Sequence, residues 1–135
     1  MTGNITVNSS DGNTIWAGAG TGTDNVTGGT GDRIVMNARA TGVKGADSSL
    51  VLKDVQSGHA NNVAVIGQSS DVHTQTIDTT GSAATVNVYA GADNITYTGK
   101  NGTLVGNGSN QTSVWDVTGV SGGVNTLWAG NGAVT

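Results

Sequence analysis

Apolar residues recur along the chain in short alternating runs, and turn-forming residues separate one run from the next. Alternation with a period of two indicates β-strands, and no 3.6-residue period lasts long enough to indicate a helix of ordinary length. We therefore predict an all-β protein whose strands follow one another at intervals of roughly ten residues. The strands are expected at residues 4–8, 13–17, 24–27, 33–36, 50–55, 62–66, 73–77, 84–90, 94–98, 103–106, 113–117 and 124–129.

The strands are short and large side chains are scarce, which limits how two sheets can stack. The chain has 23 Gly, no Pro, no Phe, three Trp and two Tyr, too few bulky residues for the ~10 Å core of a β-sandwich. A solenoid needs only small branched residues inside and Gly, Asn or Asp at its corners. The pattern favours one β-solenoid-like domain over residues 1–135, with about seven coils of about 18 residues and a length of about 35 Å.

Residues 38–57 depart most from this pattern. The stretch holds three of the five basic residues, Arg39, Lys44 and Lys53. Two interpretations stay open: an excursion off the solenoid that makes lateral contacts, or a plain long loop.

Charge and composition exclude several classes of function. Nine Asp and no Glu against five Lys and Arg give a net charge of −4, which argues against nucleic-acid or anionic-membrane binding. No apolar run approaches the ~20 residues of a membrane span. The first ten residues lack the basic and apolar regions of a cleaved signal peptide. Cys is absent, so disulfides and thiolate metal sites are excluded.

Residues 19–36 read as two nonapeptides in tandem, AGTGTDNVT and GGTGDRIVM. They resemble the Gly-Gly-x-Gly-x-Asp-x-U-x repeat (U, a large aliphatic residue) of haemolysin-type, or RTX, β-rolls. The first copy departs from the repeat only at Ala19. The second has Arg33 where the Asp belongs, with Asp32 one place earlier. Residues 89–97 and 129–135 look like eroded copies, so the resemblance covers about a third of the chain.

The resemblance implies a β-roll fold with calcium as cofactor, shared between stacked turns on the same edge. Calcium takes six to eight oxygen ligands at ~2.4 Å. The candidate ligands are the carboxylates of Asp24 and Asp32 and the carbonyls of Gly20, Gly22, Gly29 and Gly31. The alternative is that these are ordinary Gly-Asp corners that shape the turns. The resemblance also implies a bacterial protein, at the cell surface or outside the cell, exported by an uncleaved C-terminal signal.

One phrase occurs near both ends of the chain. NTIWAGAG at 13–20 and NTLWAGNG at 125–132 agree at six of eight positions, and VNVYAGAD at 86–93 has Tyr89 in the place of Trp. A solenoid repeats the same environment at every coil, so such a phrase can recur. We expect Ile15 and Leu127 to face inward and Trp16 and Trp128 to face outward.

The sequence shows no cap for the two ends of such a rod: no helix, no Pro and no terminal charge cluster. Either the chain is a piece of a longer protein, or the ends pair, subunit on subunit. We predict a non-enzymatic extracellular structural protein that assembles end to end into filaments or a biofilm matrix, with calcium as a further requirement. The expected interface residues are Trp16, Trp128, Ile15, Leu127 and Tyr89.

Other functions have weaker support. A set of His73, Asp71 or Asp78, and Ser69 or Ser70 suggests catalysis only on paper, and no Gly-x-Ser-x-Gly elbow accompanies it. His59 and His73 lack the acidic cluster of a zinc site. The rival interpretations are a glycan-binding module that uses Trp16, Tyr89, Trp115 and Trp128, an ice-binding module that uses the Thr-x-Thr steps at 21–23, 74–76 and 96–98, and a trimeric phage-fibre segment.

Overall fold

The computed structural model describes residues 6–17, 22–36, 44–66, 70–89, 91, 93–106 and 115–128. These residues form twelve strands and no helix, which confirms the all-β prediction. Every predicted strand overlaps an observed one, and their described ends differ by at most two residues. The strands are β1 (Thr6–Asn8), β2 (Thr14–Ala17), β3 (Thr23–Thr27), β4 (Arg33–Met36), β5 (Ser48–Lys53), β6 (Ala60–Val65), β7 (Thr74–Asp78), β8 (Thr85–Tyr89), β9 (Asn94–Gly99), β10 (Gly102–Val105), β11 (Trp115–Gly119) and β12 (Thr126–Trp128).

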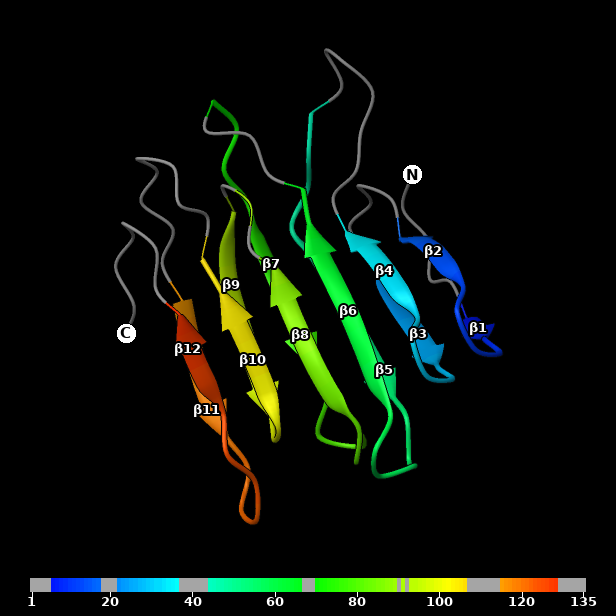
Figure 1. Cartoon of the computed structure of the whole chain (residues 1–135). Coiled ribbons are helices and arrows are strands. Elements are labelled where there is room, and N and C mark those ends of the chain that lie inside the picture. Colours follow the sequence, from blue (N-terminus) through cyan, green and yellow to red (C-terminus); the bar gives the residue numbers. More distant parts are fainter. Residues whose placement is uncertain are drawn as a thin grey trace.

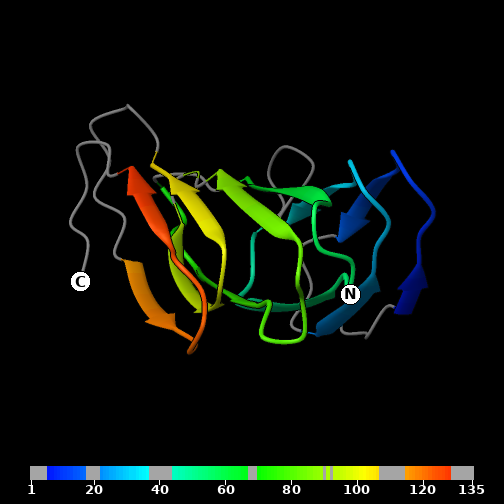
Figure 2. The ribbon, with the colours of Figure 1, turned by 60° about the horizontal axis from the view of Figure 1, so that its bottom comes forward.

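The strands lie in two parallel sheets that together make a β-solenoid (Figure 1). Sheet A contains the odd-numbered strands in the order β1-β3-β5-β7-β9-β11, and sheet B contains the even-numbered strands in the order β2-β4-β6-β8-β10-β12. Because consecutive strands alternate between the sheets, the chain winds as a flattened coil, with its first and last strands at opposite ends (Figure 2). This confirms the solenoid prediction.

The coils are uneven in length. Residue 6 lies opposite residue 25 and residue 23 opposite residue 49, whereas residue 86 lies opposite residue 102. One coil therefore takes 19, 26 or 16 residues at these three places. The expectation of about seven regular coils is wrong, since the longer coils leave room for only six strands in each sheet.

The stretch 38–57 is partly built into the solenoid. Residues 48–53 form β5 in sheet A, and Leu50 and Leu52 are fully buried. Residues 38–43 lie outside the described part of the chain. The proposed excursion or loop therefore does not extend over β5, whose alternation of apolar and polar residues matches that of its neighbours.

The core is a thin stack of aliphatic rows. One row of sheet B runs through Ile34, Val63, Val88 and Leu104, which lie opposite one another in register and are at most 1% exposed. Each row places similar side chains above one another at the ~4.8 Å strand spacing, so branched residues fill the interior without aromatic bulk.

Tyr97 is the exception in this core. Its ring is fully buried, and its hydroxyl lies 2.8 Å from Thr79 Oγ1. A Cβ at position 102 would lie 2.5 Å from the Tyr97 hydroxyl, so Gly102 is needed for the ring to fit. The short β9–β10 corner is thus shaped around one large side chain.

Burial raises the pKa of the Tyr97 phenol above its usual value, Asp78 raises it further, and the hydrogen bond with Thr79 opposes the rise. The contribution of this group to stability is therefore full below pH ~10 and is lost as the pH rises through its folded-state pKa. We expect the urea midpoint to fall in alkali, and to fall less steeply in Tyr97→Phe, as followed by circular dichroism. Tyr89→Phe, at a half-exposed position, is the control. Parallel alkaline profiles for wild type and Tyr97→Phe would contradict this expectation.

Candidate functional site

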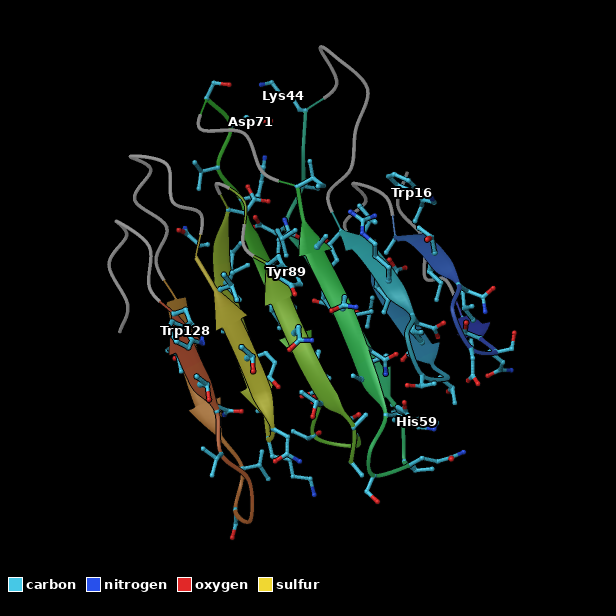
Figure 3. All side chains as sticks on the ribbon, in the orientation of Figure 1. Trp16, Lys44, His59, Asp71, Tyr89 and Trp128 are labelled. Atoms are coloured by element: carbon cyan, nitrogen blue, oxygen red, sulfur yellow. The ribbon has the colours of Figure 1, made fainter. Side chains whose placement is uncertain are left out.

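The exposed aromatic residues of sheet B lie in one row across the sheet. Trp16 is on β2, Tyr89 on β8 and Trp128 on β12, so the row reaches from one edge strand to the other (Figure 3). The paired residues of the row are Trp16, Val35, Ala64, Tyr89, Val105 and Trp128.

The orientation predicted for the repeated phrase is confirmed. Trp16 and Trp128 are 64% and 65% exposed, whereas Ile15 packs against the hydrophobic core. Leu127 continues the inner row beside Leu104 but remains 38% exposed. The last inner side chain is uncovered because β12 is an edge strand with a neighbour on one side only.

The edge strands carry few of the features that usually block pairing. β2 and β12 are the edges of sheet B, and β1 and β11 are the edges of sheet A. β1, β2 and β12 contain no charged residue, β11 contains only Asp116, and the chain has no Pro. Natural proteins protect edge strands with Lys, Pro or bulges, because unpaired backbone groups template the addition of another strand.

A column of polar residues connects the turns that lead from sheet A into sheet B. Asp32 Oδ1 accepts a hydrogen bond from the backbone N–H of Asn13 at 2.8 Å, and Asn61 Oδ1 accepts one from Asp32 N–H at 3.2 Å. Asn125 Oδ1 accepts one from Gly102 N–H at 2.9 Å. In each case the side chain receives the N–H of the corresponding residue one coil earlier.

This set, which we name the turn column, occupies one register position directly before the outward row that begins with Thr14. Val86 and Gly102 hold the same position without a side-chain acceptor, and Val86 N–H instead donates to Asn101 O. The members of the turn column are Asn13, Asp32, Asn61, Val86, Gly102 and Asn125.

The middle of the turn column carries a buried acid. The Asp54 carboxylate accepts a hydrogen bond from Asn61 Nδ2 at 3.0 Å and lies 3.0 Å from His59 Nδ1. Its backbone N–H and C=O both bond to Ser82 Oγ in the next coil. Asp54 is 2% exposed and Ser82 1%, so this network satisfies polar groups that burial would otherwise leave costly.

The predicted calcium ligands do not converge on one place. Asp24 lies near the start of β3, whereas Asp32 follows the opposite end of that strand. Both Asp32 oxygens already accept backbone N–H groups, from Asn13 and from Gly29. The Gly22 carbonyl accepts Ser49 N–H, and Gly20 lies outside the described residues.

Gly29 and Gly31 have structural roles in the same turn. A Cβ at Gly29 would lie 2.3 Å from Asp11 Oδ1, and Gly31 has a positive φ of 75°. Within the described ranges, no group of three or more His or Asp side chains is placed to hold a metal ion. The geometry described here fits a turn-shaping role and does not itself assemble a calcium site, so calcium binding stays a prediction.

A second polar cluster lies on the opposite edge of the solenoid, where Figure 3 places Asp71, away from His59. His73 Nδ1 lies 3.2 Å from Asp47 Oδ1, and His73 Nε2 lies 3.1 Å from Asp71 Oδ1. The hydrogen bond that Thr74 N–H donates to Asp47 is the main cause that lowers the pKa of that carboxyl. The cluster joins the connections that precede β5 and β7.

The structure adds little support for catalysis. The His73–Asp71 pair of the paper triad exists, but Ser69 lies outside the described residues. The hydrogen bonds described for the rings of His59 and His73 all go to aspartates.

The threonine steps form an incomplete array on the outer face of sheet A. Thr76 lies opposite Thr96, whereas Thr98 lies opposite Asp78 and Thr96 opposite Asp116. Aspartates therefore interrupt the threonine rows. Thr21, of the first step, lies outside the described residues.

Comparisons of the chain with models of protein families, with curated proteins and with solved structures find no match. The likeness to RTX proteins therefore rests on residues 19–36 and on the parallel β-solenoid, which is compatible with a β-roll. The described residues form no helix that is long and apolar enough to span a membrane.

We expect Asp32→Ala to lower the free energy of unfolding by about 1.5–3 kcal/mol, because it removes a buried carboxylate that accepts two backbone N–H groups. Asp116→Ala, at an exposed site on β11, is the matched control and should change little. Urea unfolding is measured for both variants with millimolar calcium and with excess chelator. An Asp32→Ala curve that superimposes on that of Asp116→Ala would contradict the structural role. A calcium-dependent stabilisation that Asp32→Ala abolishes would identify Asp32 as a ligand.

Proposed function

We propose that this chain is a structural subunit that assembles end to end into filaments. In the filament, β11 and β12 of one copy pair with β1 and β2 of the next. The observation that carries the proposal is that both edge strands of sheet B have the same Asn-Thr-aliphatic-Trp sequence, with their Trp residues in one register row.

Continuation of the register matches like with like in sheet B. If the next copy adds β2 beside β12 in the register that β12 keeps with β10, Trp16 comes beside Trp128 and Ile15 beside Leu127. The half-exposed Leu127 side chain then becomes an interior member of its row. Burial of this apolar surface, together with new backbone hydrogen bonds, favours the contact.

Sheet A can continue at the same time. Its register places Thr6 of the next copy beside Thr118, just as Thr118 lies beside Thr98. Thr6 and Thr14 are eight residues apart, and so are Thr118 and Thr126. The first and last coils therefore have corners of equal length between these rows, which allows both sheets to pair without a change in either corner.

The contact is between two different surfaces of the same chain. All strands within each sheet are parallel, so a copy that adds to β12 keeps the direction of its predecessor and presents its own β12 to the following copy. A head-to-tail contact of this kind gives an open filament unless a rotation closes it into a ring.

The remainder of the proposal is where the filaments act and what controls them. We place them outside the cell or on its surface as matrix material, with assembly dependent on calcium. The RTX-like residues 19–36 support both parts. Filaments that persist in excess chelator would remove calcium from the proposal and leave the end-to-end contact in place.

We expect Trp16→Ser and Trp128→Ser each to raise the protein concentration needed for assembly at least about tenfold, because each removes an aromatic anchor from the junction. Sedimentation velocity and negative-stain microscopy measure this across a dilution series. Tyr89→Ser is the matched control, because Tyr89 lies in the same row but in the middle of sheet B.

Other sizes in the same experiment would contradict the proposal. A monomer at all concentrations would leave the aromatic row as a surface for a ligand such as a glycan. A closed trimer would favour a fibre segment. Loss of assembly in Tyr89→Ser, equal to that in the Trp variants, would indicate side-by-side association of sheet B faces.

A further inference from the structure

The turn column repeats one contact from coil to coil. A side-chain oxygen at this position accepts the backbone N–H of the residue in the same position one coil earlier, as Asp32 does for Asn13 and Asn61 does for Asp32. Asn125 makes the fullest version of the contact. Its Oδ1 accepts from Gly102 N–H at 2.9 Å, and its Nδ2 donates to Gly99 O at 3.0 Å.

Asn13 has the same position in the first coil but no earlier coil to contact among the described residues. It begins the turn column, and it precedes the Thr-aliphatic-Trp sequence as Asn125 does. Its Nδ2 instead donates to Ser10 O at 2.6 Å and to Ser9 Oγ at 3.0 Å, within its own turn. These contacts are exposed to solvent, so exchanging them for contacts with a neighbour costs little.

We propose that Asn13 and Asn125 form a bridge between copies that fixes the register of the filament, an inference that rests on the proposed end-to-end function. Asn13 Oδ1 accepts the backbone N–H of Asn125 in the preceding copy, as Asn125 Oδ1 does from Gly102. Asn13 Nδ2 donates to Gly119 O of that copy, because Gly119 lies beside Gly99 in the sheet. The partner is therefore a second copy of this chain, which presents its β11–β12 corner.

The bridge supplies what the paired strands alone do not. A shift of the junction by two residues would keep the inner and outer faces of both sheets and still form backbone hydrogen bonds. The same shift would move the Asn13 amide away from both Asn125 N–H and Gly119 O. The two hydrogen bonds thus favour one register over its nearest competitor, the role that single buried asparagines have in coiled coils.

The test first establishes the register. The chain has no Cys, so Thr14→Cys with Thr126→Cys introduces the one pair that the proposed junction brings face to face. Oxidation of the assembled double variant should give a ladder of covalent oligomers, whereas each single variant should give dimers at most. Filaments without such a ladder would overturn the proposed register and leave the end-to-end function intact.

The second measurement concerns the bridge itself. We expect Asn13→Ala to raise the critical concentration for assembly about tenfold, the effect of losing two hydrogen bonds of ordinary strength. Asn25→Ala, on the exposed face of β3, is the control and should leave it unchanged. Thermal unfolding of the monomers shows that both variants fold.

The outcomes separate this inference from the proposed function. Folded Asn13→Ala that assembles at the wild-type critical concentration overturns the bridge while the filament stands. Wild-type protein that remains monomeric overturns the proposed function and the bridge with it.

Discussion

The fold depends on hydrogen bonds that side chains at the corners make to the backbone of the preceding coil. A parallel solenoid with so few aromatic residues buries little apolar surface at each level, so its coils need another constraint to stay in register. The carboxylate of Asp32 and the amides of Asn61 and Asn125 provide it, because each accepts an N–H one coil earlier. Where the column has no acceptor, at Val86 and Gly102, the buried Tyr97 and its hydrogen bond to Thr79 fill the corner instead.

The same constraint links the fold to the proposed assembly. A solenoid held by contacts from each coil to the one before it has no internal reason to stop, and it is stopped in natural proteins by caps. In the described part of this chain the outermost strands are bare, nearly uncharged and similar to each other in sequence. The contacts that order the coils within one chain are therefore the contacts available to order one chain upon the next.

The sequence predicts the strands and the outward Trp16 and Trp128 well, because both follow from local alternation. It does not predict the coil lengths, since the chain inserts different numbers of residues at different corners. The turn column is also hidden, because Asn and Asp are abundant and only the register shows which of them coincide. The misplaced acid of the second nonapeptide was a signal: β4 starts at Arg33, so residue 33 faces solvent and Asp32 faces inward. For calcium, the sequence supplied the ligand types but not their separation on opposite edges.

The most direct test of the account is X-ray diffraction from aligned filaments of the wild-type chain. Continuous sheets predict a strong meridional reflection at ~4.8 Å, from strands perpendicular to the filament axis. With six strands of each sheet per copy, they also predict an axial repeat near 29 Å, or a helical pattern built on that rise. Filaments that lack the meridional 4.8 Å reflection, or whose axial rise does not correspond to six strands, would contradict the claim that one solenoid continues into the next.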